Sequence, residues 1–505
     1  MPIKVTVIGA GSVGFTRGMM RDILAIPELR DTEITLMDIS EQNLDMVYQL
    51  LKRDIECAGL PAKVRATTNQ REAVTGANYV FSFVRVGGLE AFKVDIDVPL
   101  RYGVDQCVGD TLCTGGIFYA QRTIPVLLGV CKDIAEVGAP DCLFLNYSNP
   151  MAMNTWACNQ YGHGVRAIGL CHGVEGGWWQ IANVLGLPKD EVDIICAGIN
   201  HQTWYVQVRH NGVDMTGKLL EAFEQHPEYS KTEKVRIDML RRFGYYSTES
   251  NGHLSEYVPW YRKRAGEIND WIDLGCWING ETGGYLRVCT EGRNWFEHDF
   301  PNWMAAPPMS FAPEDRGHEH GSHIIEGLET GRCYRGHFNV VNRGCITNLP
   351  PDCIVEVPGY VDGNGMSIPI VGDLPLGCAA VCNNSVTVQR MSMEAAVHGD
   401  DTLLRQAMMM DPLTGAVCNP PEIWQMADEM LVELEPWLPQ YANAIVDAKK
   451  RLAGGTLIKT QVGYTGAARL HTKSVDEMEA DREEARKNAA EADKAKERKA
   501  AEATA

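Results

Sequence analysis

The sequence lacks the features that mark secreted or membrane-bound chains. Its N-terminus, MPIKVTVIGAG, has no basic head, long apolar core or small-residue cleavage site, and no apolar run approaches the length needed to span a bilayer. The 16 cysteines are scattered and form no CxxC pair. We therefore expect a cytoplasmic protein with reduced, mostly buried thiols, and we exclude zinc-ribbon and thioredoxin-like sites.

Basic residues are also scarce. Lysine and arginine number 47 against 66 aspartates and glutamates, so the formal net charge is −19. This balance argues against nucleic acids and anionic membranes as main partners, because phosphate groups need basic surfaces. It is still compatible with a small acidic substrate held by a local arginine.

The first part of the chain alternates between strand and helix patterns. We predict strands at residues 3–8, 33–37, 79–85, 142–147, 165–170 and 192–197, and helices at 16–25, 40–57 and 123–137. Such alternation predicts an α/β fold with a Rossmann-like, doubly wound parallel sheet covered by helices on both faces.

Beyond about residue 200 the pattern changes. Helical stretches dominate, and we expect strands of a smaller sheet at residues 353–361 and 368–371. A chain of 505 residues is too long for one ordinary core. We therefore expect one domain over residues 1–200, a second mixed α+β, mainly helical domain over 201–472, and a charged helical or disordered tail over 473–505.

The first predicted strand runs directly into a dinucleotide-binding fingerprint, GxGxxG, at Gly9, Gly11 and Gly14. The first glycine permits a tight turn, the second lets the backbone approach a pyrophosphate, and the third permits close packing of helix and strand. Asp38 ends the second predicted strand, where its carboxylate can accept both ribose hydroxyls and repel a 2′-phosphate. We predict NAD as the cofactor, with Arg85 as a further contact at the same sheet edge; a plain loop is the alternative for Arg85.

Four motifs follow at or just after predicted strands: GDTLCTGG, NYSNPMAMNTW, GLCHG and AGINH. Because strand ends of one sheet converge, the motifs predict one pocket containing Asp110, Asn149, Cys171, His172 and His201. A thiolate and an imidazole suit a soft or borderline divalent metal, and two protein ligands leave positions for substrate oxygens. A Cys–His nucleophile pair is a weaker alternative, because adjacent residues on a strand point to opposite faces. A further alternative is that these residues are buried for structural reasons alone.

In this order the motifs resemble glycoside hydrolase family 4, the NAD- and manganese-dependent glycosidases, and within it the bacterial α-galactosidases. The likeness covers roughly residues 3–440 and is carried by IGAGS, LMDI, GDTL, RTIP, LNYSNPMAMNTWA, GLCHGVEG, CAGINH, FGYYSTES, HLSEYVPW, TNLPPDCIVEV and MMDPLTGAV. The family fold is like that of lactate and malate dehydrogenases. The chain departs from the family pattern with CTGG at 113–116 and CHGVEGGWW at 171–179.

The resemblance implies an unusual hydrolysis of α-glycosides, with α-galactosides as the expected substrates. The sugar is oxidised by NAD at C3, loses its C2 proton, eliminates the aglycone and adds water, with no net redox change. Cys171 and His201 are implied as ligands of Mn²⁺ or another divalent metal, and Asn149 as a sugar contact. His172 is implied as the acid that protonates the leaving oxygen. Asp110 is expected to hold the sugar or the nicotinamide side, and a structural cap is its alternative.

The resemblance places the C2 base in the segment matching residues 244–257. Tyr246 is the first choice, provided that a nearby metal lowers its pKa, and His253 and Glu256 are the alternatives. Each of these side chains is equally compatible with a purely structural role.

The resemblance also implies a homodimer or homotetramer, with the substrate, metal and oligomerisation functions in residues 201–472. α-Galacturonides, α-glucosides and glucuronides are alternative substrates, for which Arg287 and Arg293 are candidate uronate contacts. Outside the glycosidases, the alternatives are an NAD-dependent 2-hydroxy-acid dehydrogenase and an NAD-sensing regulator.

Overall fold

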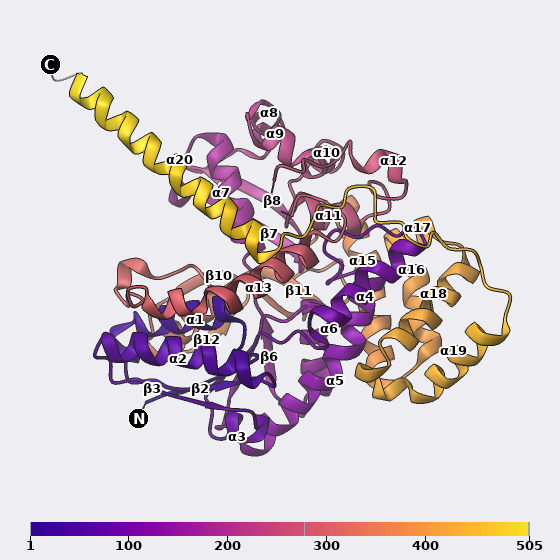
Figure 1. Cartoon of the computed structure of the whole chain (residues 1–505), viewed down its shortest axis with the longest axis horizontal. Coiled ribbons are helices and arrows are strands. Elements are labelled where there is room, and N and C mark those ends of the chain that lie inside the picture. Colours follow the sequence, from indigo (N-terminus) through magenta and orange to yellow (C-terminus); the bar gives the residue numbers. More distant parts are fainter. Residues whose placement is uncertain (1, 277, 503–505) are drawn as a thin grey trace.

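The computed structural model describes residues 2–276 and 278–502. A 12-stranded sheet runs through the molecule in the order β3-β2-β1-β4-β5-β6-β10-β11-β7-β8-β9, and β12 pairs with β11. Helices lie around this sheet (Figure 1). Its two halves differ in strand direction.

The first half of the sheet is parallel throughout. Its strands are β1 (Lys4–Ile8), β2 (Glu33–Met37), β3 (Lys63–Thr67), β4 (Tyr79–Ser82), β5 (Leu143–Asn146) and β6 (Arg166–Gly169). The spatial order 3-2-1-4-5-6 is that of a dinucleotide-binding fold, which confirms the Rossmann-like prediction. The connecting helices are α1 (Val13–Leu24), α2 (Glu41–Cys57), α3 (Gln70–Val74), α4 (Gly88–Arg101), α5 (Cys113–Val137) and α6 (Met151–Tyr161).

The second half of the sheet is antiparallel. It contains β7 (Val192–Ile199), β8 (Gln202–His210), β9 (Val213–Asp214), β10 (Tyr334–Val341), β11 (Ile354–Asp362) and β12 (Gly365–Ser367). The prediction of a separate smaller sheet was wrong, because β10 pairs with β6 through Asn339 and Gly169 and so continues the first half. The strand predicted at residues 368–371 was also wrong; β12 ends just before it.

The remaining helices follow β6. They are α7 (Gly173–Leu185), α8 (Leu219–Gln225), α9 (Tyr229–Thr232), α10 (Lys234–Phe243), α11 (Asn251–Tyr257), α12 (Ala265–Ile268), α13 (Gly284–Ala305), α14 (His320–Thr330), α15 (Leu376–His398), α16 (Asp401–Met410), α17 (Pro412–Val417), α18 (Pro420–Glu433), α19 (Ala442–Gly454) and α20 (Val475–Glu502). Short 3₁₀ turns lie at η1 (Pro27–Leu29), η2 (Lys189–Glu191), η3 (Thr216–Lys218), η4 (Pro313–Asp315), η5 (Glu435–Trp437) and η6 (Pro439–Tyr441).

Residues 475–502 of the predicted charged tail form α20, which extends away from the body of the molecule (Figure 1), and residues 503–505 lie outside the described part of the chain. It contacts α13 through Arg482, whose guanidinium lies 3.7 Å from the ring centroid of Trp295, and through an ion pair between Glu479 and His298. No helix within residues 2–276 and 278–502 is both long and apolar enough to cross a membrane. All 16 cysteines are free thiols.

Candidate active site

The turn after β1 brings the backbone against two neighbouring segments. Gly9 has φ +83°, and a Cβ there would lie 2.8 Å from the carbonyl carbon of Phe83. The N–H of Gly11 donates to Oδ2 of Asp38 at 2.8 Å, and a Cβ on Gly11 would lie 2.9 Å from that oxygen. Gly14 differs, because among the described residues no atom lies within 4 Å of a Cβ built there. Close packing therefore explains the first two glycines and not the third.

The carboxylate of Asp38 is fixed at the end of β2. Its Oδ2 accepts from Gly11, and its Oδ1 accepts from the N–H of Ser40 at 2.9 Å. Ser40 caps α2 by accepting from the N–H of Asn43. The acidic group therefore stands beside the glycine turn, which is the arrangement that a bound ribose requires.

Arg85 follows β4 and lies among aromatic rings. Its guanidinium carbon is 4.3 Å from the ring centroid of Phe92, 5.0 Å from that of Tyr119 and 5.3 Å from that of Tyr285. Its Nη2 lies 3.5 Å from Oδ2 of Asp110. Its Nη1 is buried and has no hydrogen-bond partner among the residues that the structure describes. One donor of Arg85 therefore lacks a protein partner in the described part of the chain.

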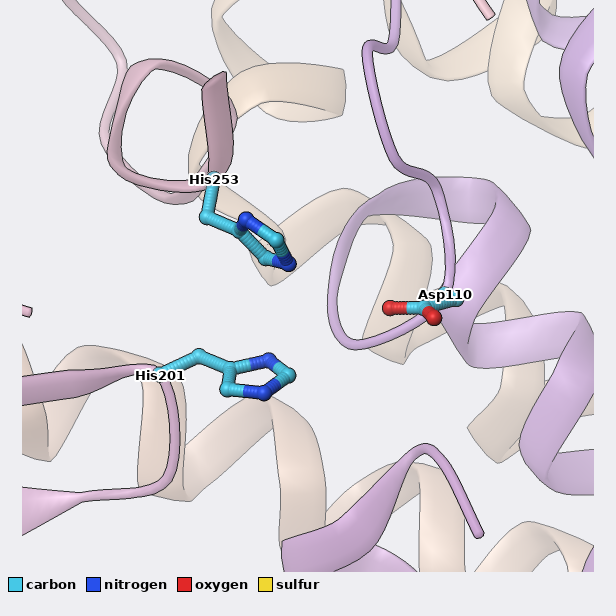
Figure 2. Close-up of side chains that lie close together, drawn as sticks. All are labelled: Asp110, His201 and His253. Atoms are coloured by element: carbon cyan, nitrogen blue, oxygen red, sulfur yellow. The ribbon is translucent and has the colours of Figure 1, made fainter. Parts of the chain in front are cut away.

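Asp110, His201 and His253 point toward one another from three separate elements (Figure 2). Asp110 lies in the loop before α5, His201 in the turn between β7 and β8, and His253 in α11. One ligand atom of each lies within 4.8 Å of the others. Nδ2 of Asn149 donates to Oδ2 of Asp110 at 3.0 Å, so this amide belongs to the same group.

The tautomer of His201 follows from its hydrogen bonds. The hydroxyl of Thr111 contacts Oδ1 of Asp110 and Nδ1 of His201, both at 2.9 Å. Because a carboxylate only accepts, Thr111 donates its single hydrogen to Asp110 and accepts from Nδ1–H of His201. Burial lowers the pKa of His201, which favours the neutral ring. Nε2 therefore presents a lone pair.

This lone pair lies near a thiol and a second carboxylate. Nε2 of His201 lies 3.2 Å from Oε2 of Glu249, and Cys171 completes a set of three ligand atoms within 4.8 Å of one another. Cys171 is 6% exposed at the end of β6, and burial raises the pKa of its thiol well above the usual range. A thiol, an imidazole and a carboxylate thus converge where the sequence predicted only Cys171 and His201.

His172 lies apart from Cys171 although the two are adjacent. Its side chain is 60% exposed at the start of α7, and its Nδ1 lies 3.6 Å from Oε1 of Glu319. The thiol is buried and the imidazole is accessible, so the two side chains do not form a nucleophile pair.

The structure does not bring Tyr246 into this group. The ring of Tyr246 is fully buried, stacks on Phe223 with centroids 4.1 Å apart, and donates to Oε1 of Gln180. Burial raises the pKa of this phenol well above 10, the opposite of what a base needs.

The structure gives the other two candidate bases different surroundings. Glu256 is fully buried and accepts three backbone N–H bonds from the loop 107–109, which is a structural role. His253 lies beside His201, with ring centroids 4.8 Å apart. Ser250 engages Nδ1 of His253 at 2.6 Å, which leaves Nε2 as the free ring nitrogen.

Both parts of the chain match models of one enzyme family. Residues 4–187 match the family 4 glycosyl hydrolase model, and residues 196–414 match the family 4 glycosyl hydrolase C-terminal domain. The chain belongs to glycosyl hydrolase family 4. An α-galactosidase of Rhizobium meliloti is 56% identical to this family 4 enzyme over 96% of the chain and 99% of that protein.

Solved structures agree with this assignment. A 6-phospho-α-glucosidase from gut microorganisms, in complex with NAD and glucose-6-phosphate, superposes with a TM-score of 0.72 at 25% identity, over 87% of this chain and 99% of that one. A 6-phospho-β-glucosidase from Thermotoga maritima with manganese, NAD⁺ and glucose-6-phosphate gives 0.70 at 22% identity, over 86% and 99%. The second likeness shows a shared fold.

Two arginines that the sequence offered as uronate contacts in this family 4 enzyme are already paired. Arg287 donates to Glu281 at 2.9 Å and to Glu291 at 3.1 Å, and Arg293 lies 3.6 Å from Glu90.

Sequence reasoning missed Glu249 as a member of the site. It lies in the quoted segment FGYYSTES, but neither its spacing nor its neighbours distinguish it from the other polar residues there.

Proposed function

We propose that this family 4 enzyme hydrolyses α-galactosides and that NAD and a divalent metal, Mn²⁺ foremost, are its retained cofactors. The observation that carries the choice of substrate is the 56% identity with the R. meliloti α-galactosidase over nearly the whole of both chains. Solved relatives that hold NAD, one of them with manganese, support the cofactors.

The residues at the glycine turn fit NAD. Gly9 and Gly11 pack closely against Phe83 and Asp38, and this packing holds the turn at the N-terminal end of α1, where a pyrophosphate would bind. Asp38 would accept the ribose hydroxyls, and Arg85 has a free buried donor nitrogen. Gly14 belongs to the same motif, although no neighbour restricts its side chain.

The residues at the ends of β6 and β7 fit a divalent metal. Cys171 and His201 offer a sulfur and an imidazole lone pair, a donor set that suits borderline divalent ions. When bound, NAD would take up and return a hydride at C3, and the metal would act as a Lewis acid on the sugar oxygens.

The protein's own side chains would bind the sugar and move its protons. Asn149 and Asp110 would bind the sugar hydroxyls, since Oδ1 of Asn149 has no partner within the described part of the chain. Nε2 of His253 would take the proton from C2, and its place beside His201 supports this role over the one predicted for Tyr246. The exposed imidazole of His172 would protonate the leaving oxygen.

The proposed reaction is tested with a panel of p-nitrophenyl glycosides. We expect release of nitrophenol from the α-galactoside only when NAD⁺, Mn²⁺ and a thiol reductant are all present, and we expect no accumulation of NADH. The panel also contains the α-glucoside, the α-galacturonide and a 6-phosphoglucoside. Cys171→Ser should abolish metal-dependent turnover and retain NAD binding.

Two results would contradict this function. Absence of release from every α-glycoside would reject the glycosidase reaction, and stoichiometric NADH from an alcohol substrate would indicate a dehydrogenase instead. If the enzyme prefers the α-galacturonide, the proposed reaction stands and the proposed substrate is replaced.

We also propose the cellular setting and organisation of the enzyme. Its 16 free thiols support the reducing cytoplasm. The nucleotide would be held by residues 1–200, and the substrate and metal by residues 201–472 together with Asp110, Asn149, Cys171 and His172, in a homodimer or homotetramer.

A further inference from the structure

We infer that Glu249 is a third protein ligand of the metal, so that Cys171, His201 and Glu249 hold the ion before any sugar binds. The inference rests on the proposed function in one respect, namely that the protein binds a divalent metal at Cys171 and His201. It adds a ligand, a donor type and an order of binding.

The first argument is that two acceptors face each other. Thr111 accepts from Nδ1–H of His201, so the neutral form of this ring presents its lone pair at Nε2. Oε2 of Glu249 lies 3.2 Å from this nitrogen, is buried, and makes no hydrogen bond to any residue that the structure describes. Two buried acceptors at this distance repel each other unless a proton or a metal cation lies between them.

The neighbouring imidazole does not remove this conflict. Nε2 of His253 lies 3.4 Å from the same oxygen of Glu249, but the pair does not have hydrogen-bond geometry. An ion-pair role for Glu249 with His253 is nonetheless the competing explanation, and the experiment below separates the two.

The second argument comes from Gly173. A Cβ at this position would lie 2.7 Å from Cγ of Glu249 and 3.2 Å from its carboxyl carbon. The backbone of Gly173 does not adopt the left-handed conformation that would itself require glycine. The missing side chain therefore provides the space in which the carboxylate of Glu249 reaches the thiol of Cys171.

The third argument is the chemistry of the donor set. A thiolate and a carboxylate carry two negative charges, which balance a divalent cation, and neutral His201 completes the set. Three protein ligands with further positions open are typical of catalytic metal sites, where substrate oxygens take the remaining positions. The metal is then retained when the sugar leaves.

The test measures Mn²⁺ affinity without sugar. Metal-depleted, NAD-loaded enzyme is titrated with Mn²⁺, and the free ion is quantified by electron paramagnetic resonance. We expect Glu249→Gln to weaken binding by roughly 10–100-fold or more, the range known for residues that support a metal site. Gly173→Ala should weaken it comparably by displacing the carboxylate. Gly176→Ala is the matched control, because it lies on the same helix with open space around its Cβ.

The outcomes distinguish the inference from the function on which it rests. If Cys171→Ser loses Mn²⁺ while Glu249→Gln and Gly173→Ala bind like wild type, the third ligand is wrong and the two-residue site stands; this is also the result expected if Glu249 only pairs with His253. If the wild type binds no divalent ion, both fail. Thermal melting checks whether Glu249→Gln is folded. If it is not, the Mn²⁺ affinity of Gly173→Ala compared with that of Gly176→Ala tests the inference.

Discussion

Gly11 is enclosed by side chains, whereas Gly14, in the same motif, is not. A Cβ on Gly11 would lie 2.9 Å from both Oδ2 of Asp38 and Cβ of Asn43, whereas one on Gly14 would meet no described atom within 4 Å. We therefore expect Gly11→Ala to weaken NAD binding by about tenfold or more, equivalent to about 1.4 kcal/mol. Gly14→Ala should bind NAD nearly as well as wild type and stabilise α1 by up to about 1 kcal/mol.

Isothermal titration with NAD⁺ and thermal melting measure these two effects. Equal losses of affinity in both variants would mean that the cofactor itself, rather than the neighbouring side chains, restricts the third glycine.

Individual site residues were predictable where a motif follows a strand. Cys171 and His201 meet because β6 and β7 both end at the site, and a strand end can be predicted from sequence. Glu249 enters from the loop between α10 and α11, which has no periodic pattern. The resemblance made Tyr246 the first choice of base over His253, and the packing of its ring against Phe223 is what argues against that choice.

At the scale of elements, Glu175 joins α7 to β10 and η2. Its Oε1 lies 3.3 Å from Nδ1 of His337, and its Oε2 accepts from Nζ of Lys189 at 3.2 Å. Burial raises the pKa of this carboxyl, but the hydrogen bond and charge of His337 and the charges of His320 and Lys189 outweigh it, so that the pKa falls to about 2. The ionised form therefore stabilises the fold above the ordinary value of 4.5, and this contribution is lost as the pH falls toward 2.

We expect Glu175→Gln to lower the free energy of unfolding by about 2 kcal/mol at pH 7, with a smaller difference at pH 3. Urea unfolding at both pH values measures it. Glu191→Gln removes an exposed carboxylate that pairs with His210 and serves as the control, with a smaller effect expected. A difference for Glu175→Gln that is the same at pH 3 as at pH 7 would contradict the charge argument.

Strand positions were predicted better than strand directions. The apolar run at 192–197 is the same for a parallel or an antiparallel strand, but two turn residues separate β7 from β8, and such a short connection permits only antiparallel pairing. β12 was missed although Asp362 pairs with Gly365 across the two-residue turn Gly363–Asn364, which is a recognisable hairpin signal. The apolar residues Ile368 and Ile370 led to the prediction of a strand after β12 in place of β12 itself.

At the scale of the whole molecule, the division into two sheets was the main error. The alternation of strands and helices predicted the parallel half except for β3, which was missed. The continuation depends on the pairing of Gly169 with Asn339 and of Gly198 with Glu356, contacts between residues far apart in the chain. No local pattern encodes such contacts. The sheet is therefore larger than the sequence indicated.

Asp105 connects four distant parts of this unit. It lies between α4 and α5, is 2% exposed, and accepts from Nη2 of Arg262 at 2.6 Å, from the hydroxyl of Thr282 at 2.8 Å and from the N–H of Ala467 at 2.9 Å. Arg262 is itself 1% exposed. Removal of the charge on Asp105 would therefore leave a buried guanidinium without its counter-ion, which is the costly way to break an ion pair.

We expect Asp105→Asn to lower the free energy of unfolding by about 3–5 kcal/mol. Asp352→Asn breaks an exposed ion pair with Arg390 and should cost no more than about 1 kcal/mol. Urea unfolding followed by tryptophan fluorescence measures both.

Because Asp105 also holds the backbone at Ala467, Asp105→Asn should speed limited proteolysis of the segment between α19 and α20, and Asp352→Asn should not. Equal stability of the two variants would mean that Arg262 finds sufficient compensation in the carbonyl of Gly280, to which it donates at 2.6 Å, and that the four segments are held together by apolar packing alone.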